Sequence, residues 1–233
     1  MQKSIPLLLA SGCAMGINWI LFFEALDNTT VSAATLSYYF APVIVTLVCP
    51  IIFKEKMTAK SWICFAAATI GIVLVLISSQ SDDGEYNHVL GIIFGLLAAC
   101  FYATVILLNK FIKNVDGIHR TFLQFLSAIV TLIPYVLLTS GVQVATLDRK
   151  GWICLLIVGL VHTGVTYCLY FSSLKELPGQ KAAILSYIDP LVAVLVSCFV
   201  LGEKITLLQI LGGALILGFT LWNEITPKKN KRS

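Results

Sequence analysis

An apolar stretch with a charged end occurs twice in this chain, 148 positions apart. Residues 35–58 read TLSYYFAPVIVTLVCPIIFKEKMT, and residues 183–206 read AILSYIDPLVAVLVSCFVLGEKIT. The copies share a proline, a Glu-Lys pair and a threonine at the same spacing. Without gaps, the same offset gives 13 identities over the 51 positions from 16 to 66. A repeat of hydrophobic segments is typical of membrane transport proteins that are built from two related halves.

Apolar runs account for most of the sequence, and each has about 20 residues, the length with which an α-helix crosses a bilayer. The chain is 58% hydrophobic and 12% charged, with a mean hydropathy of +0.91, and a soluble core cannot bury that much apolar surface. A membrane β-barrel would show short strands of alternating polarity instead. We therefore predict an all-α polytopic membrane protein with eight transmembrane helices. The predicted spans are 5–26, 31–53, 61–79, 89–109, 121–140, 151–173, 182–202 and 206–223.

Basic residues are distributed unevenly between the two sets of connecting segments. With the N-terminus placed in the cytoplasm, the cytoplasmic segments hold 13 Lys and Arg residues and the outer segments hold 3. Cytoplasmic loops of membrane proteins carry such an excess of positive charge. We therefore expect a plasma (inner) membrane protein with its N- and C-termini in the cytoplasm.

This orientation places the two copies of the repeat on opposite faces of the membrane. Lys54–Lys56 would lie inside and Gly202–Lys204 outside, which makes the repeat inverted. The second unit has five spans and the first has only three. Either the chain is a fragment, or its start was assigned at an internal Met, or the protein functions with eight helices. The predicted segments are a partial first repeat at 1–79, an extracytoplasmic linker at 80–88, a second repeat at 89–225 and a basic cytoplasmic tail at 226–233.

These residues resemble the drug/metabolite transporter superfamily in its EamA-like branch, whose members have two five-helix repeats. The family pattern appears first at Ala25–Leu26, Thr29–Thr30, Pro42, Glu55–Lys56, Thr58 and Gly71. It recurs at Ser173–Leu174, Pro190, Gly202–Glu203–Lys204, Thr206 and Gly212–Gly213. The resemblance covers residues 1–225. It implies a secondary transporter that moves small organic metabolites, such as amino acids or drugs, more often outward than inward. It also implies that the first two helices of the first repeat are absent.

Two prolines occupy matching places in the second and seventh predicted spans. Pro42 and Pro190 each remove a backbone donor and crowd the preceding turn, so each should kink its helix. Tyr39 and Tyr187 precede them by three residues and should lie one turn away on the same face. Paired kinks near the midplane are where transporters place their substrate sites. The alternative is that the prolines only bend the helices.

Three ionisable side chains fall inside the predicted spans, where burying a charge is costly. Glu24 lies near the outer end of the first span, His162 in the middle of the sixth, and Asp189 directly before Pro190. None has an ionisable counterpart at the 148-residue offset, which favours a functional role. We expect Asp189 above all, with Glu24 and His162, to couple transport to protons. The alternatives are a hydrogen-bonded packing carboxyl, a carboxylate that reaches the outer interface and a core histidine.

Aromatic and amide side chains on the same spans fit an organic substrate, because tyrosine offers both an apolar face and a hydroxyl group. Interfacial anchoring or packing is the alternative for each of them. Further tyrosines on these spans are Tyr38, Tyr102, Tyr167 and Tyr170. The predicted substrate-binding residues are Asn18, Trp19, Tyr39, Pro42, Tyr187, Asp189 and Pro190.

The polar ends of the two repeats are expected to have a structural role. Glu55 and Glu203 should end one helix and open the next, with Thr58 or Thr206 as the N-cap. Gly91 and Gly95 form a GxxxG pattern that predicts close helix packing.

Enzyme classes known inside membranes lack their residues in this sequence. An aspartyl protease needs two facing Asp residues, a metalloprotease needs HExxH, and a serine enzyme needs a suitable serine motif near His162. The 7 cysteines are scattered and form no CxxC, so we expect no metal site and no cofactor. The expected partners are a small-molecule substrate and the lipid bilayer, with a homodimer as a way to complete the cavity, and no nucleic acid. The alternative to a transporter is a non-transporting fragment or assembly subunit.

Overall fold

The computed structural model describes residues 5–53, 59–79, 87–112, 115, 117–139, 147–165 and 188–225. Over these ranges the secondary structure is helical and contains no strand, as predicted for an all-α protein. The helices are α1 (Ile5–Asn28), α2 (Val31–Tyr38), α3 (Ala41–Phe53), α4 (Ala59–Ser79), α5 (His88–Phe111), α6 (Gly117–Leu138), α7 (Arg149–Leu156), the π-helical segment η3 (Ile157–Val165), α10 (Ile188–Phe199) and α11 (Leu207–Ile225).

Three helical segments of the described part are long and apolar enough to cross a bilayer, namely Ile5–Asn28, His88–Asn109 and His119–Leu138. The second predicted span is divided into α2 and α3. The end of the sixth predicted span and the start of the seventh lie outside the described residues. Shorter apolar stretches are Val31–Val45, which runs from α2 into α3, Trp62–Val75 in α4 and Leu207–Asn223 in α11.

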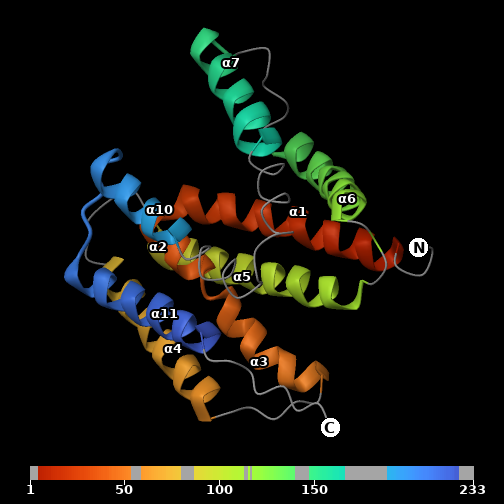
Figure 1. The fold of residues 1–233 in the computed structure, drawn as a ribbon. Helices are drawn as coiled ribbons and strands as arrows, with labels where there is room; N and C mark the ends of the chain where they lie inside the picture. The colour runs from red at the N-terminus through yellow and green to blue at the C-terminus, as the bar shows by residue number, and fades with distance from the viewer. Residues whose placement is uncertain are drawn as a thin grey trace.

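Helix α1 packs along α5 and α6 (Figure 1). Small residues of α1 let α6 come close. A Cβ atom added to Gly12 would lie 2.5 Å from the carbonyl oxygen of Gln124, and one on Gly16 would lie 3.0 Å from that of Ala128. At the same contact, Gln124 Nε2 donates a hydrogen bond of 2.7 Å to Ser11 Oγ. Small residues spaced by four positions are a common packing device between membrane helices.

The predicted packing role of the GxxxG pattern in α5 agrees with the structure. A Cβ atom on Gly95 would lie 2.0 Å from Ser37 Oγ, and one on Gly91 would lie 2.6 Å from Thr29 Cβ. Helix α5 therefore lies directly against α2 and the residue that precedes α2's N-cap, and any larger residue at these glycines would push the two helices apart.

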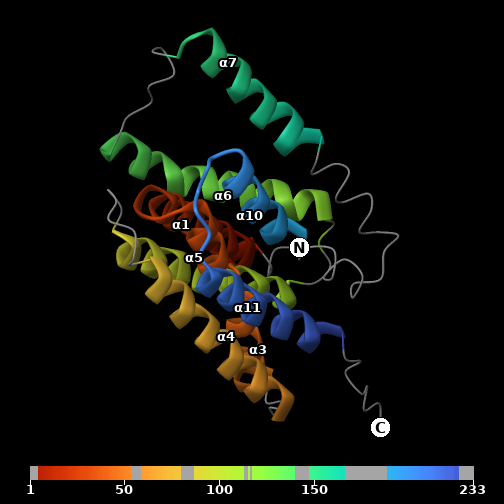
Figure 2. The same ribbon diagram turned by 90° about the vertical axis from the view of Figure 1, so that its left-hand side faces the viewer.

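Helices α4 and α11 lie side by side in both views (Figures 1 and 2). A Cβ atom on Gly71 would lie 2.6 Å from the carbonyl oxygen of Gly212, and the reciprocal distance is also 2.6 Å. Further along, Cys64 Sγ donates to the carbonyl oxygen of Phe219 at 3.2 Å. Under the offset of 148 residues, Gly71 corresponds to position 219 and Gly212 to position 64. The offset therefore converts the pair of positions 71 and 212 into the pair 219 and 64. Each of the two contacts is thus the counterpart of the other in the sequence repeat.

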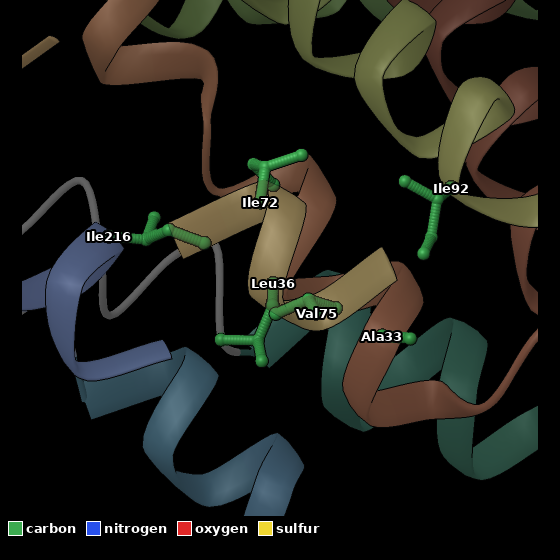
Figure 3. Close-up of a cluster of buried hydrophobic side chains, with 6 residues drawn as sticks. All are labelled: Ala33, Leu36, Ile72, Val75, Ile92 and Ile216. Atoms are coloured by element: carbon green, nitrogen blue, oxygen red, sulfur yellow. The ribbon is translucent and has the colours of Figure 1, made fainter. Parts of the chain in front are cut away.

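A buried apolar cluster joins α2 to α4, α5 and α11 (Figure 3). Its side chains come from helices far apart in the sequence, so α2 occupies the centre of the described fold. The residues of the cluster are Ala33, Leu36, Ile72, Val75, Ile92 and Ile216.

Helix α7 stands apart from the other described helices and continues directly into η3 (Figure 1). Its Leu156 side chain is 53% exposed, whereas Leu8 of α1, its counterpart at the 148-residue offset, is 1% exposed. The difference follows from the packing, because α1 is covered by α5 and α6 and α7 has no comparable cover among the described helices.

Candidate functional site

The helix of the second predicted span breaks between α2 and α3. Pro42 has no N–H group to bond to the preceding turn, and its ring crowds that turn. The Tyr39 N–H group still bonds to the carbonyl oxygen of Thr35 at 3.0 Å, but the Phe40 N–H group bonds to that of Ser37 at 3.2 Å. This shortening of the hydrogen-bond pattern ends α2, so the interruption predicted at Pro42 is present.

The second proline of the repeat, Pro190, lies in α10. This helix is described from Ile188 onward, and Pro190 is fully buried in it. Helix α3 begins at Ala41, and Pro42 is its second residue. Proline is well tolerated in a first helical turn, where its missing donor would have no partner. Tyr187, the predicted companion of Pro190, lies outside the described residues.

Four aromatic rings gather at the break between α2 and α3, and we call them the aromatic cluster: Phe22, Tyr38, Tyr39 and Tyr102. The ring of Tyr38 is central, with centroids 4.8 Å from Phe22, 5.4 Å from Tyr102 and 6.0 Å from Tyr39. The cluster is not sealed, since Tyr102 is 40% exposed and the other three rings are partly exposed. It therefore presents apolar faces and phenol groups at an interrupted helix.

Three members of this cluster are among the aromatic residues that the sequence predicts near the site, and Phe22 is not. Its counterpart at the 148-residue offset is Tyr170, so an aromatic residue occupies both positions of the repeat. That shared aromatic character was the available signal. The grouping itself depends on how α1, α2 and α5 pack, which no spacing along the chain reveals.

Two predicted substrate-binding residues make contacts between helices. Asn18 is buried, and its Nδ2 donates a hydrogen bond of 2.6 Å to the carbonyl oxygen of Ala98 in α5. The ring of Trp19 lies 5.6 Å from that of Phe125 in α6, at an interplanar angle of 41°. These contacts fasten α1 to its neighbours, and the substrate role of Asn18 and Trp19 remains a prediction.

Glu24 has a partner on another helix, which the sequence did not indicate. The Tyr135 hydroxyl of α6 donates to Glu24 Oε1, and Asn28 Nδ2 donates to the backbone oxygen of Glu24 at 2.8 Å. The side chain of Glu24 is half-buried. The predicted role of Glu24 in proton coupling remains a prediction.

Asp189 and His162 are placed by their backbones only. Asp189 lies in α10, directly before Pro190, and His162 lies in η3. The contacts of their side chains lie outside the described part of the structure. A π-helical segment such as η3 often marks a functional site within a helix. The proton-coupling roles of both residues remain predictions.

Metal binding finds no support in the described ranges. No group of three His, Cys, Asp or Glu side chains there could hold a metal ion.

Comparison with known proteins gives a consistent result over nearly the whole chain. A family model described as the EamA-like transporter family matches residues 2–77 and 89–223. The chain is 32% identical over 215 residues to the uncharacterized transporter YxxF of Bacillus subtilis (strain 168), covering 92% of this chain and 68% of that protein. It is also 32% identical over 206 residues to an uncharacterized transporter of Archaeoglobus fulgidus, covering 87% of this chain and 71% of that protein.

One solved structure, described only as a crystal structure of protein, has a similar fold. It superposes with a TM-score of 0.56 and 15% sequence identity, covering 93% of this chain and 84% of its own. At that level of identity the likeness concerns the fold alone.

Proposed function

Because the chain belongs to the EamA-like transporter family, we propose that it is a secondary transporter that exports small organic metabolites such as amino acids or drugs. As a member of this family it is a multi-pass membrane protein, and its relatives are named as transporters. The proposed location is the plasma (inner) membrane, with both termini in the cytoplasm. The excess of Lys and Arg in the predicted cytoplasmic segments supports this orientation.

The proposed mechanism is alternating access, in which two inverted repeats rock against each other around a central site. One observation supports a symmetric relation between the halves: the Gly71–Gly212 and Cys64–Phe219 contacts exchange under the 148-residue offset. A relation of this kind is what rocking between two equivalent arrangements requires.

The aromatic cluster is the observation that carries the proposed function. It lies where the helix is interrupted, and its rings remain partly exposed after the described helices have packed. An aromatic face can stack on an apolar solute, while a phenol can donate a hydrogen bond to it. Irregular backbone at membrane depth is tolerated where it is buried in protein or lines a cavity. We therefore assign substrate binding to the break at Pro42, with Tyr38, Tyr39 and Tyr102 as contacts.

The uncovered face of α7 and η3 fits the same arrangement. Helices α5 and α6 cover α1. Under an inverted repeat, two equivalent helices would cover α7 and η3, the counterpart of α1, in the same way. This proposal accounts for the exposure of Leu156 where its counterpart Leu8 is buried.

Uptake into proteoliposomes tests the proposed function. The purified protein is reconstituted with an imposed pH gradient and offered a panel of radiolabelled amino acids, with ethidium as a cationic drug probe. We expect at least one panel member to accumulate above the level in protein-free liposomes. If Asp189 couples transport to protons, collapsing the pH gradient and the Asp189→Asn substitution should each remove the accumulation. Folded, monodisperse protein that moves no member of the panel would contradict the assignment.

A further inference from the structure

The loop between α10 and α11 brings Glu203 against the first half of the chain. Gly202 has a φ of 72°, in the left-handed region that favours glycine. After this turn, the Glu203 N–H group bonds back to the carbonyl oxygen of Ser197 at 3.1 Å. The loop is thereby folded onto the end of α10, and the Glu203 carboxylate reaches α2.

The Glu203 carboxylate accepts hydrogen bonds from both halves. Oε1 accepts the Val31 N–H group at 2.8 Å, and Oε2 accepts the Ser32 N–H group at 3.4 Å and the Ser32 hydroxyl at 3.2 Å. The Ser197 hydroxyl of α10 also donates to Oε2, and the Ser32 and Ser197 hydroxyl oxygens lie 2.7 Å apart. We call Glu203, Ser197 and Ser32 the latch. The first N–H groups of a helix lack partners within the helix and carry partial positive charge, so a carboxylate is stabilised there.

Capping of α11 does not require Glu203. The Thr206 hydroxyl accepts the Gln209 N–H group at 3.2 Å, and Gln209 Oε1 accepts the Thr206 N–H group at 3.0 Å. This reciprocal pair is a capping box, and it confirms Thr206 as the predicted N-cap. Since α11 has its own cap, the Glu203 carboxylate is available for α2.

Helix α2 also has a cap of its own. The Thr30 hydroxyl accepts the Ala33 N–H group at 3.3 Å, so Glu203 supplies acceptors only for the two residues before Ala33. The role predicted for Glu203 was to end one helix and open the next. That role does not include its main contact, which is with the start of α2. The glutamate of the second repeat joins α10 to α2.

We propose that the latch is a gate of the transport cycle, closed in this structure and opened when the two halves rock apart. The proposal rests on the proposed alternating-access function. It assigns Glu203 as a positioning residue that holds the start of α2 against the end of α10. The latch lies at the end of the bundle that the sequence predicts to be extracytoplasmic, so it closes the outer side.

The chemistry of the contact suits a gate. A hydrogen bond between protein groups replaces bonds to water, so its net contribution to stability is small, and groups at a helix end can return to water when the contact opens. The Gly71–Gly212 contact differs because it consists of closely packed helix backbones. Water cannot replace that packing when the helices separate. Rocking would therefore separate the halves at the latch and keep them together at α4 and α11.

Thiol labelling tests whether the latch opens. Ser197 is 0% exposed, so a cysteine at this position can react only when the latch opens. In a variant whose native cysteines are replaced, Ser197→Cys is treated with a membrane-impermeant maleimide from the outer side. We expect Glu203→Gln to raise the labelling rate at least about tenfold, because it removes a charge-assisted acceptor from the start of α2. The matched control is Lys204→Gln, which changes the charge of the exposed next residue and should leave the rate unchanged.

Cross-linking then separates a gate from a fixed structural contact. The Ser32→Cys and Ser197→Cys pair should form a disulfide on oxidation, since the native oxygens lie 2.7 Å apart. Uptake of the amino acid that the panel shows to be transported should fall at least about tenfold on oxidation and return with a reductant, as expected when a gate cannot open.

Two results would overturn the gate. One is that Ser197→Cys is labelled at the same rate with and without the Glu203→Gln substitution. The other is full uptake with the cross-link formed, which would make the contact a static one. Failure of the wild-type protein to transport any panel member would instead count against the proposed function, and the labelling rates would still decide whether the latch opens.

Discussion

Gly212→Leu is expected to destabilise the protein strongly. A Cβ atom at this position would lie 2.6 Å from the Gly71 carbonyl oxygen and 2.9 Å from Val75 Cγ2. The first neighbour is backbone, so rotation of a side chain cannot relieve the overlap, and α4 and α11 must separate. Separation would also weaken the Cys64–Phe219 hydrogen bond and expose part of the buried cluster around Ile216. We expect a loss of about 3 kcal/mol, at the upper end for an overpacked site.

The same helix offers a matched control for this substitution. Gly218 is also in α11, but a Cβ atom there would meet nothing within 4 Å. Gly218→Leu should leave the melting temperature equal or slightly higher, because leucine favours helix more than glycine does. Thermal melting followed by size-exclusion chromatography in detergent measures both variants. Equal melting temperatures for Gly212→Leu and Gly218→Leu would show that the close approach of α4 and α11 is not needed.

Tyr38→Ala is expected to reduce transport at least about tenfold, which corresponds to about 1.4 kcal/mol of lost interaction. Tyr38 is the central ring of the aromatic cluster, so its removal takes away one proposed substrate contact and the ring contacts with Phe22, Tyr39 and Tyr102. The effect on folding should be smaller, because the ring is only partly buried. Initial uptake rates of the transported amino acid in proteoliposomes measure the change.

Two further variants make the test of Tyr38 specific. Trp62→Ala removes a ring from α4 that is 56% exposed and pairs with Phe65 at 6.3 Å, and Trp62 is not a member of the aromatic cluster. Its uptake rate should equal that of the wild-type protein. Tyr38→Phe keeps the ring and loses the hydroxyl, so it should retain most of the uptake if stacking dominates. A Tyr38→Ala variant that transports at the wild-type rate would remove the aromatic cluster from the proposed site.

The helices and the break at Pro42 could be predicted because their causes are local. Apolar length determines what can cross a bilayer, and a proline removes one backbone donor wherever it occurs. The capping of α11 by Thr206 is equally local, since the Gln209 partner lies three residues away. These features required no knowledge of which helices are neighbours.

The contacts between helices could not be predicted in the same way. In a bilayer both lipid and protein neighbours are apolar, so hydrophobic pattern says little about which face meets another helix. Glu203 lies 172 and 171 positions from Val31 and Ser32, whose backbone N–H groups bond to its carboxylate, and nothing in the spacing links them. The partner of Glu24, Tyr135, is likewise on a helix that the sequence did not place beside α1. Only the repeat connects positions that are far apart in the sequence. It makes Phe22 and Tyr170 equivalent, for example.

Accessibility of the helix break from the two sides of the membrane tests the central claim most directly. In a variant whose native cysteines are replaced, Tyr39→Cys is exposed to a membrane-impermeant maleimide, first in right-side-out and then in inside-out vesicles. Alternating access around the aromatic cluster predicts that the cysteine reacts from both faces, because each arrangement of the repeats opens the site to one of them. A cysteine at position 39 that reacts from one face only, or from neither, would contradict this account.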